Sequence, residues 1–119
     1  MAACLIDSYK FGSIVVDGRG YRSDVIVFPD RVLDGWWRRE GHHLFVEDLK
    51  EVFEAEPKPE VIVVGTGNSG LMKVSSEVEE TLRSSGIELV AESTKEACRT
   101  FNELLKSGRR VVAALHLTC

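Results

Sequence analysis

The sequence predicts an α/β protein: a three-layer domain with a mixed central sheet, a second half of β-α-β-α-β order and an N-terminal β-hairpin. Two observations carry this prediction. Apolar, β-branched runs at 61–64, 87–91 and 111–117 alternate with two segments of helical periodicity. An Asp-Gly pair at 17–18 stands between two further β-branched runs, which is a strong hairpin signal.

The N-terminal half holds the predicted hairpin. We expect strands at 13–16 and 21–28, joined across 17–20. Pro29 ends the second strand because proline has no N–H to give to a ladder. Residues 30–45 show no regular period and contain both tryptophans. The hairpin therefore either makes the central sheet mixed or forms a second, smaller sheet.

The middle of the chain is expected to pass from a short helix into a buried strand. Leu49, Val52 and Phe53 fall on one face of a helix predicted at 46–54. The strand at 61–64 is apolar at every position. Such a run is typical of a strand covered on both faces of a parallel sheet.

Two longer helices follow. Ser-x-x-Glu capping boxes predict helix starts at Ser76 and Ser93, and glycines at 86 and 108 predict their ends. Because each helix lies between two strands, right-handed crossovers and a parallel arrangement are expected. The second helix carries an apolar stripe made of Ala97, Cys98, Phe101, Leu104 and Leu105.

Size and composition indicate one domain over residues 1–119, with 44% hydrophobic residues. The net charge of −4 argues against nucleic-acid and anionic-membrane binding. The 3 cysteines show no paired spacing, which favours a reducing compartment. Neither a signal peptide nor an apolar run long enough to span a bilayer is visible. We therefore expect a cytoplasmic protein. No cofactor is expected.

A glycine-rich loop follows the predicted strand at 61–64. Its glycines have no Cβ, so a ligand could approach their backbone N–H groups. The G-x-G-x-x-G spacing is that of dinucleotide-binding loops, but the next helix signal comes only at Ser76, too late to face a pyrophosphate. A structural turn is the favoured interpretation, and anion binding remains open. The candidate ligand-binding residues are Gly65, Thr66, Gly67, Asn68, Ser69 and Gly70.

The pair Trp36–Trp37 precedes the pair Arg38–Arg39. Tryptophan and arginine are enriched among the residues that anchor protein interfaces. Neighbouring side chains in extended backbone point in opposite directions. One tryptophan is therefore expected in the core, and the other is a candidate surface anchor.

The histidines and cysteines are the other side chains that could carry chemistry. His42 is a candidate acid–base group if it lines a cleft. A metal site built from His42 or His43 with His116 and Cys119 would require the fold to bring them together. Since no spacing is typical of zinc, no metal is expected. A loop histidine beside the tryptophans and a strand histidine bonded to backbone are favoured instead, and Cys98 is expected to be inert filler in the helix stripe.

Across nearly its whole length, the chain resembles domain-of-unknown-function family 498. The resemblance rests on motifs that appear in this order: Ser8-Tyr9-x-Phe11-Gly12, Tyr21-x-x-Asp24-Val25, Trp36-Trp37-Arg38 with Gly41-His42, Gly65-Thr66-Gly67-x-x-Gly70, Gly86-Ile87, Thr94-x-x-Ala97, Phe101-Asn102-x-Leu104 and His116-Leu117-Thr118-Cys119. The family includes mitochondrial complex I assembly factor 3, an adipogenesis-associated protein and short prokaryotic proteins. Without a visible presequence, the chain looks like the stand-alone prokaryotic form.

The resemblance implies a three-layer α/β domain around a mixed sheet, with no established catalysis and a role in assembly or regulation through protein contacts. The residues expected in a pocket or interface are Asp24, Trp36, Trp37, Arg38, Arg39 and His42. The first hypothesis is accordingly a protein-interaction module with an unidentified protein partner. The alternative is an anion- or nucleotide-binding domain, or an enzyme, that uses the loop at 65–70.

Overall fold

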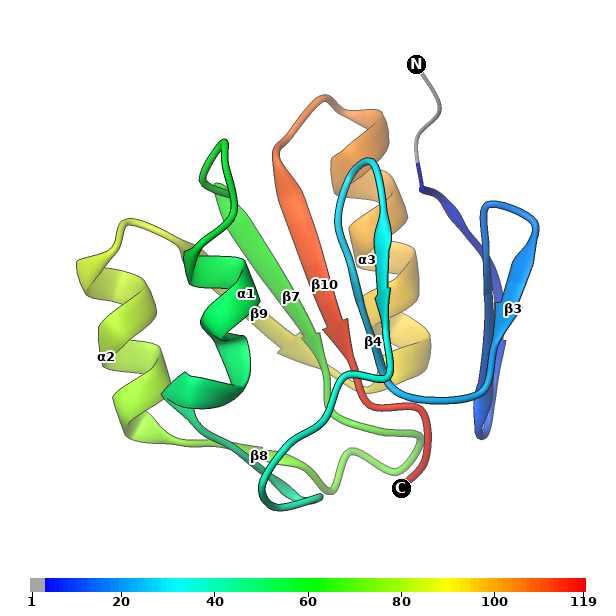
Figure 1. Ribbon diagram of the computed structural model, residues 1–119, viewed down its shortest axis with the longest axis horizontal. Helices are drawn as coiled ribbons and strands as arrows, with labels where there is room; N and C mark the ends of the chain where they lie inside the picture. Colours follow the sequence, from blue (N-terminus) through cyan, green and yellow to red (C-terminus); the bar gives the residue numbers. More distant parts are fainter. Residues whose placement is uncertain (1–3) are drawn as a thin grey trace.

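The computed structural model describes residues 4–119, so residues 1–3 of the predicted domain lie outside it. Its central sheet has five strands in the order β5-β4-β10-β7-β9 (Figure 1). Strand β7 pairs in parallel with β10 and β9, whereas β4 runs antiparallel to β10 and β5. The strands are β4 (Val25–Val27), β5 (Val32–Asp34), β7 (Val61–Gly65), β9 (Glu88–Glu92) and β10 (Val111–Leu115). The predicted mixed α/β sheet is confirmed.

The second half of the chain has the predicted β-α-β-α-β order. Helix α2 (Ser76–Ser84) joins β7 to β9, and helix α3 (Thr94–Lys106) joins β9 to β10. Along β7, Val61 and Val63 belong to the core cluster shared with α3. Ile62 and Val64 belong to the cluster on the opposite face, which also contains apolar residues of α2. The period-2 alternation of a strand thus supplies both cores.

A small sheet packs beside α3 (Figure 1). It contains β1 (Ile6–Lys10), β2 (Ser13–Val16) and β3 (Arg19–Tyr21). Asp17 and Gly18, with φ of 48° and 77°, form the predicted turn of the β2–β3 hairpin. The single strand predicted at 21–28 is wrong: it divides into β3 and β4, because residues 22–24 turn and bring Asp24 against His116 and Leu117, which follow β10.

Local boundaries also differ from the sequence interpretation. The helix predicted at 46–54 is a 3₁₀ turn, η1 (Val46–Leu49), followed by α1 (Lys50–Phe53). The hydroxyl that caps α2 is that of Ser75, which accepts a hydrogen bond from Val78 N–H at 3.2 Å, rather than that of Ser76. Ser93 precedes α3 but makes no side-chain cap. The irregular stretch at 30–45 contains β5 and also β6 (His43–Leu44). Strand β6 pairs in parallel with β8 (Lys73–Val74).

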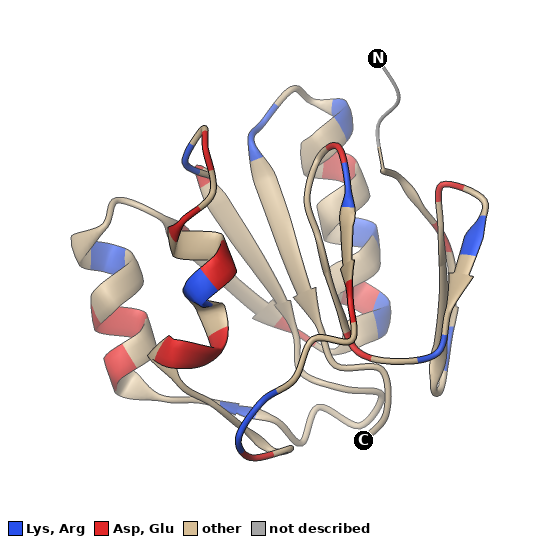
Figure 2. Ribbon diagram, viewed as in Figure 1, with Lys and Arg blue, Asp and Glu red and all other residues tan. Residues whose placement is uncertain are grey.

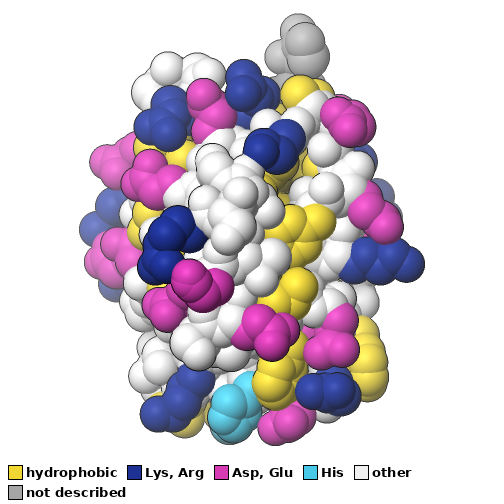
Figure 3. Space-filling view, turned by 90° about the vertical axis from the view of Figure 1, so that its left-hand side faces the viewer, with side chains coloured by type: hydrophobic (Ala, Val, Ile, Leu, Met, Phe, Trp, Pro, Cys, Tyr) yellow, Lys and Arg dark blue, Asp and Glu magenta, His cyan; other side chains and the backbone are white. Residues whose placement is uncertain are grey.

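Charged side chains gather outside the sheet. Figure 2 shows acidic residues along α1 and α2, while β7 and β10 carry almost no charge. Figure 3 shows the face made by these two helices, where hydrophobic side chains run down toward a lower edge that carries a histidine. Among residues 4–119, no helix has the length and apolar content needed to cross a bilayer.

Candidate functional site

A buried polar cluster lies where β10 ends, beside the loop that carries both tryptophans. In this loop, burial alternates along the chain. Trp36 is 6% exposed and Arg38 is 8% exposed, whereas Trp37 is 77% exposed and Arg39 is also exposed. The expected division into one core and one surface tryptophan is therefore what the fold adopts. It also buries an arginine, which needs partners for its charge.

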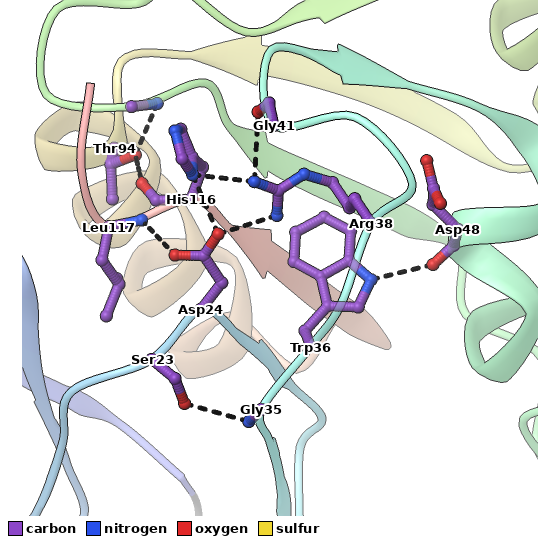
Figure 4. Close-up of polar contacts among 11 residues, drawn as sticks. Ser23, Asp24, Gly35, Trp36, Arg38, Gly41, Asp48, Thr94, His116 and Leu117 are labelled. Carbon is purple, nitrogen blue, oxygen red and sulfur yellow. Dashed lines mark hydrogen bonds and ion pairs between the residues drawn. The ribbon is translucent and has the colours of Figure 1, made fainter.

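Arg38 is held by three groups, two of which come from distant parts of the chain (Figure 4). Its Nη1 lies 2.8 Å from Asp24 Oδ2, in an ion pair whose side chains are 4% and 17% exposed. Its Nη2 lies 2.9 Å from His116 Nδ1 and donates to the carbonyl oxygen of Gly41 at 3.2 Å. One guanidinium thus joins the start of β4, the residue after β10 and its own loop.

Trp36 forms the floor beneath Arg38. Its ring centroid lies 4.6 Å from the Arg38 Cζ, close enough for a cation–π contact. Its indole N–H donates to the carbonyl oxygen of Asp48 at 2.8 Å. The buried indole therefore has its polar atom satisfied and fixes the loop against η1.

Asp24 is the anion of the cluster. Its Oδ1 accepts a hydrogen bond from Leu117 N–H at 2.8 Å, and its Oδ2 lies 2.8 Å from His116 Nδ1. Burial opposes ionisation, but the hydrogen bonds from His116, Leu117 and Arg38 outweigh it and lower the pKa of Asp24. The carboxylate is thus stabilised in its charged form.

The His116 ring contacts the side chains of Asp24 and Arg38, so the expectation of a strand histidine bonded to backbone is wrong. An aspartate on Nδ1 orients an imidazole, as it does in proton-transferring hydrolases. Here, however, Nε2 is buried and has no hydrogen-bond partner among residues 4–119. The ring also shares Nδ1 between Asp24 and Arg38. This geometry suits a fixed link between segments better than a proton shuttle.

In the glycine loop at 65–70, the backbone N–H groups of four residues donate hydrogen bonds to other groups of the protein. Gly67 has φ of 109°, and a Cβ there would lie 2.6 Å from the carbonyl oxygen of Cys119. The loop is therefore pressed against residues 118–119 and does not form the open cradle of N–H groups that anion binding would need. Its N–H donors and their acceptors are Thr66 with Glu92 O (2.9 Å), Gly67 with Thr94 Oγ1 (2.8 Å), Asn68 with Thr118 O (2.7 Å) and Gly70 with Gly67 O (3.2 Å).

Thr94 is a residue whose role the sequence interpretation missed. Its hydroxyl is fully buried, accepts from Gly67 N–H and donates to the carbonyl oxygen of His116 at 2.6 Å. It therefore ties the glycine loop to the end of β10. The motif Thr94-x-x-Ala97 was the only sequence signal, since a threonine at the start of a helix is otherwise unremarkable.

The fold does bring His42, His116 and Cys119 together. Cys119 Sγ lies 3.8 Å from His42 Nε2, and the rings of His42 and His116 are 6.1 Å apart in an edge-to-face arrangement. Nevertheless, within the described part of the chain no group of three or more His, Cys, Asp or Glu side chains is placed to hold a metal ion. His42 is exposed, so it lies on the rim of the cluster.

Thiol labelling should distinguish the cysteines. Burial raises the pKa of Cys98 to about 12, whereas Cys119 is partly exposed. We expect iodoacetamide at neutral pH to alkylate Cys119 first and to leave Cys98 unmodified in the folded protein, as measured by peptide mass spectrometry. Modification of Cys98 at the rate found in denaturant would contradict its place in the core.

Three large hydrophobic side chains are exposed on segments that contact residues 116–119. They are Phe11, Trp37 and Leu71, which are 59%, 77% and 50% exposed. The residue after Phe11 donates its N–H to Leu117 O at 2.8 Å, and Leu71 donates to Cys119 O at 3.3 Å. Trp37 adjoins Arg38, which contacts His116.

Comparison with known proteins agrees with this architecture. A rat (Rattus norvegicus) protein named NADH dehydrogenase (ubiquinone) 1 alpha subcomplex assembly factor 3 is 33% identical over 114 residues. The match covers 95% of this chain but only 60% of the relative. The chain therefore spans about three fifths of the length of the curated relatives that it matches.

Two solved structures share the fold along almost the entire chain. A Bartonella henselae protein described as an outer membrane protein superposes with a TM-score of 0.85 and 29% identity, covering 99% of this chain and 98% of that one. A Bordetella parapertussis protein gives a TM-score of 0.84 and 27% identity, with 98% of each chain covered.

The family model described as a protein of unknown function (DUF498/DUF598) matches residues 6–116. This range includes both core clusters except for Cys4 and Leu117, as well as Asp24, Arg38 and His116. The chain therefore belongs to the family of proteins of unknown function DUF498/DUF598.

Proposed function

We propose that this chain is a docking module that holds protein subunits during assembly and contacts them through Trp37 and the loop around it. The observation that carries the proposal is the contrast between neighbours: Trp37 is 77% exposed, while the Arg38 side chain is 4% exposed and tied to three segments. A large hydrophobic side chain on an ordered loop is a favourable anchor, because little conformational freedom is lost when a partner binds.

The names of the curated relatives also support a docking function in assembly. Their names describe assembly factors of an NADH dehydrogenase, which act on subunits of a larger complex. Because the chain spans only part of those relatives, the proposal concerns the shared α/β region. In this scheme Trp37, Arg39 and His42 contact the partner. Asp24, Trp36, Arg38 and the loop at 65–70 hold that surface in place.

Replacing Trp37 with alanine should weaken partner binding by at least about tenfold and change the free energy of unfolding by less than about 0.5 kcal/mol. Binding would be measured by capture of NADH dehydrogenase subunits from the chain's own organism, with a photo-crosslinking residue at position 37 to identify the contact. The same crosslinker at Lys106, on the exposed end of α3, serves as the positional control.

Trp36→Ala is the matched stability control. It removes a buried ring and its hydrogen bond, so it should cost about 3–5 kcal/mol of unfolding free energy. If Trp37→Ala left capture unchanged, or if position 106 crosslinked the same subunits as efficiently as position 37, the proposed docking surface would be wrong.

The ligand-binding alternative receives no comparable support. Its physical requirement was a set of free N–H groups in the loop at 65–70, and those of residues 66, 67, 68 and 70 are used inside the protein. Protein docking is therefore the function that the geometry supports best.

A further inference from the structure

An open groove of about 440 Å³ lies beside Trp37. Both tryptophans and β5 contribute to it on one side, and η1 and α1 contribute on the other. Its lining includes Leu33, Trp36, Trp37, Arg39, Glu47 and Glu51. Because Trp37 stands exposed beside this hollow, a partner that packs on Trp37 must also meet the walls of the groove.

The wall formed by η1 and α1 is acidic. Glu47 and Glu51 line the groove and are exposed, and the exposed Glu54 follows at the C-terminal end of α1, three residues after Glu51. Arg39 partly offsets this charge, since its Nη2 lies 3.7 Å from Glu47 Oε1. Lys50 is the other basic residue of the lining.

Asp48 adds little to the surface, although it lines the groove. It is 6% exposed, and its Oδ2 accepts a hydrogen bond from Phe45 N–H at 2.8 Å. The carboxylates available to a partner are therefore those of the exposed glutamates. The opposite side offers apolar contact from Leu33 and Trp37.

The charge of the whole helical layer points in the same direction. Residues 46–53 and 76–84, which form η1, α1 and α2, contain six acidic and two basic side chains, a net charge of −4, which equals the net charge of the entire chain. Figure 2 shows these acidic residues on α1 and α2. The charges in the rest of the chain therefore balance, and the excess negative charge lies on the helices, of which η1 and α1 line the groove and α2 does not.

We propose that this groove receives a basic amphipathic segment of a protein partner. One apolar side chain of that segment packs against Trp37 and Leu33, and its lysine or arginine side chains face Glu47, Glu51 and Glu54. This inference rests on the proposed docking function and adds the chemistry of the partner. Charge complementarity of this kind speeds encounter and selects the partner, whereas the apolar contact supplies most of the affinity.

The test uses synthetic peptides and the intact chain. A short amphipathic leucine–lysine peptide should bind, as followed by calorimetry, and its amide shift changes in ¹H–¹⁵N spectra should centre on residues 33–51. A leucine–glutamate peptide of the same length and pattern should bind at least about tenfold more weakly. Affinity for the lysine peptide should fall as salt is added, because exposed charge pairs are screened.

Charge-neutral variants locate the site. The triple variant Glu47→Gln, Glu51→Gln, Glu54→Gln should weaken binding of the lysine peptide about tenfold, the sum expected for three exposed charge pairs. The matched control, Glu77→Gln with Glu79→Gln and Glu80→Gln on α2, removes the same number of charges and should change affinity less than about twofold.

Equal binding of the two peptides, or equal losses in the two triple variants, would overturn the basic-partner inference. So would shift changes centred away from the groove. Failure of the lysine peptide to bind, together with capture of subunits through position 37, would refute the inference while leaving the docking function standing. If the lysine peptide does not bind and position 37 captures no subunits, both the basic-partner inference and the docking function are refuted.

Discussion

Asp24→Asn should lower the free energy of unfolding by about 3 kcal/mol, because it leaves the buried guanidinium of Arg38 without its counter-charge. The asparagine is nearly the same size and can still accept from Leu117 N–H, so the loss reports charge rather than volume. Chemical denaturation at neutral pH measures it. Loosening of the Trp37 loop should accompany the loss, seen as faster amide exchange in residues 36–43.

The control is an exposed pair of the same chemistry. Asp30 and Arg31 are 3.2 Å apart, with side chains 64% and 57% exposed, and Asp30→Asn should cost less than about 1 kcal/mol. Similar losses in the two variants would contradict the role assigned to the buried pair.

The difference between wild type and Asp24→Asn should also depend on pH. Because the pKa of Asp24 is lowered in the folded state, folding favours its ionised form. Its contribution is therefore present above the unfolded pKa of about 3.9 and is lost as the pH falls through the lower folded value. The stability gap between the two proteins should narrow on acidification, and a gap that widened would contradict this sign.

Gly67→Ala should cost about 3 kcal/mol. The residue has φ of 109°, which an alanine adopts only with strain, and its Cβ would lie 2.6 Å from Cys119 O and 2.9 Å from Thr118 O. To relieve this contact, residues 118–119 would have to move away from the loop. The hydrogen bond from Asn68 N–H to Thr118 O would then be lost as well.

Gly108→Ala separates strain from crowding. Gly108 has φ of 88°, but a Cβ there would have no atom within 4 Å. This variant should cost only about 1–2 kcal/mol, the strain of a left-handed alanine. The additional loss at Gly67, measured by denaturation, is the contribution of close packing. Equal losses at both positions would show that the loop does not clamp residues 118–119.

The central sheet was predictable because the apolar pattern that predicts each element lies within a short stretch of sequence. The run at 61–64 is apolar at every position, and the structure buries each residue in one of two cores. The helix stripe predicted from Ala97 to Leu105 packs in one of these two cores. Patterns of this kind need no knowledge of what lies opposite, since a strand with two apolar faces must be covered on both.

Strand β1 could not be found in this way. Most of its residues are exposed, so no alternation of apolar residues announces it. It is held instead by β2 and by Asn102, whose side chain exchanges two hydrogen bonds of 2.8 Å with the backbone of Ile6. These partners are 96 residues apart in sequence, and only the tertiary fold brings them together.

The buried cluster was only partly predictable for the same reason. Asp24, Arg38 and His116 are each polar residues in short irregular segments or at a strand end, where local patterns predict exposure. The resemblance to the family marked them as members of motifs but assigned them no contacts. Their burial follows from mutual pairing, which a single sequence does not display.

The link between Arg38 and His116 has a consequence for the order of events during synthesis. The loop that presents Trp37 emerges from the ribosome early. However, Arg38 in this loop contacts His116, which is translated 78 residues later. A nascent chain halted before that point cannot lock the loop in its final shape. Under the docking function proposed above, unfinished copies would therefore lack the ordered loop and would not occupy partner subunits.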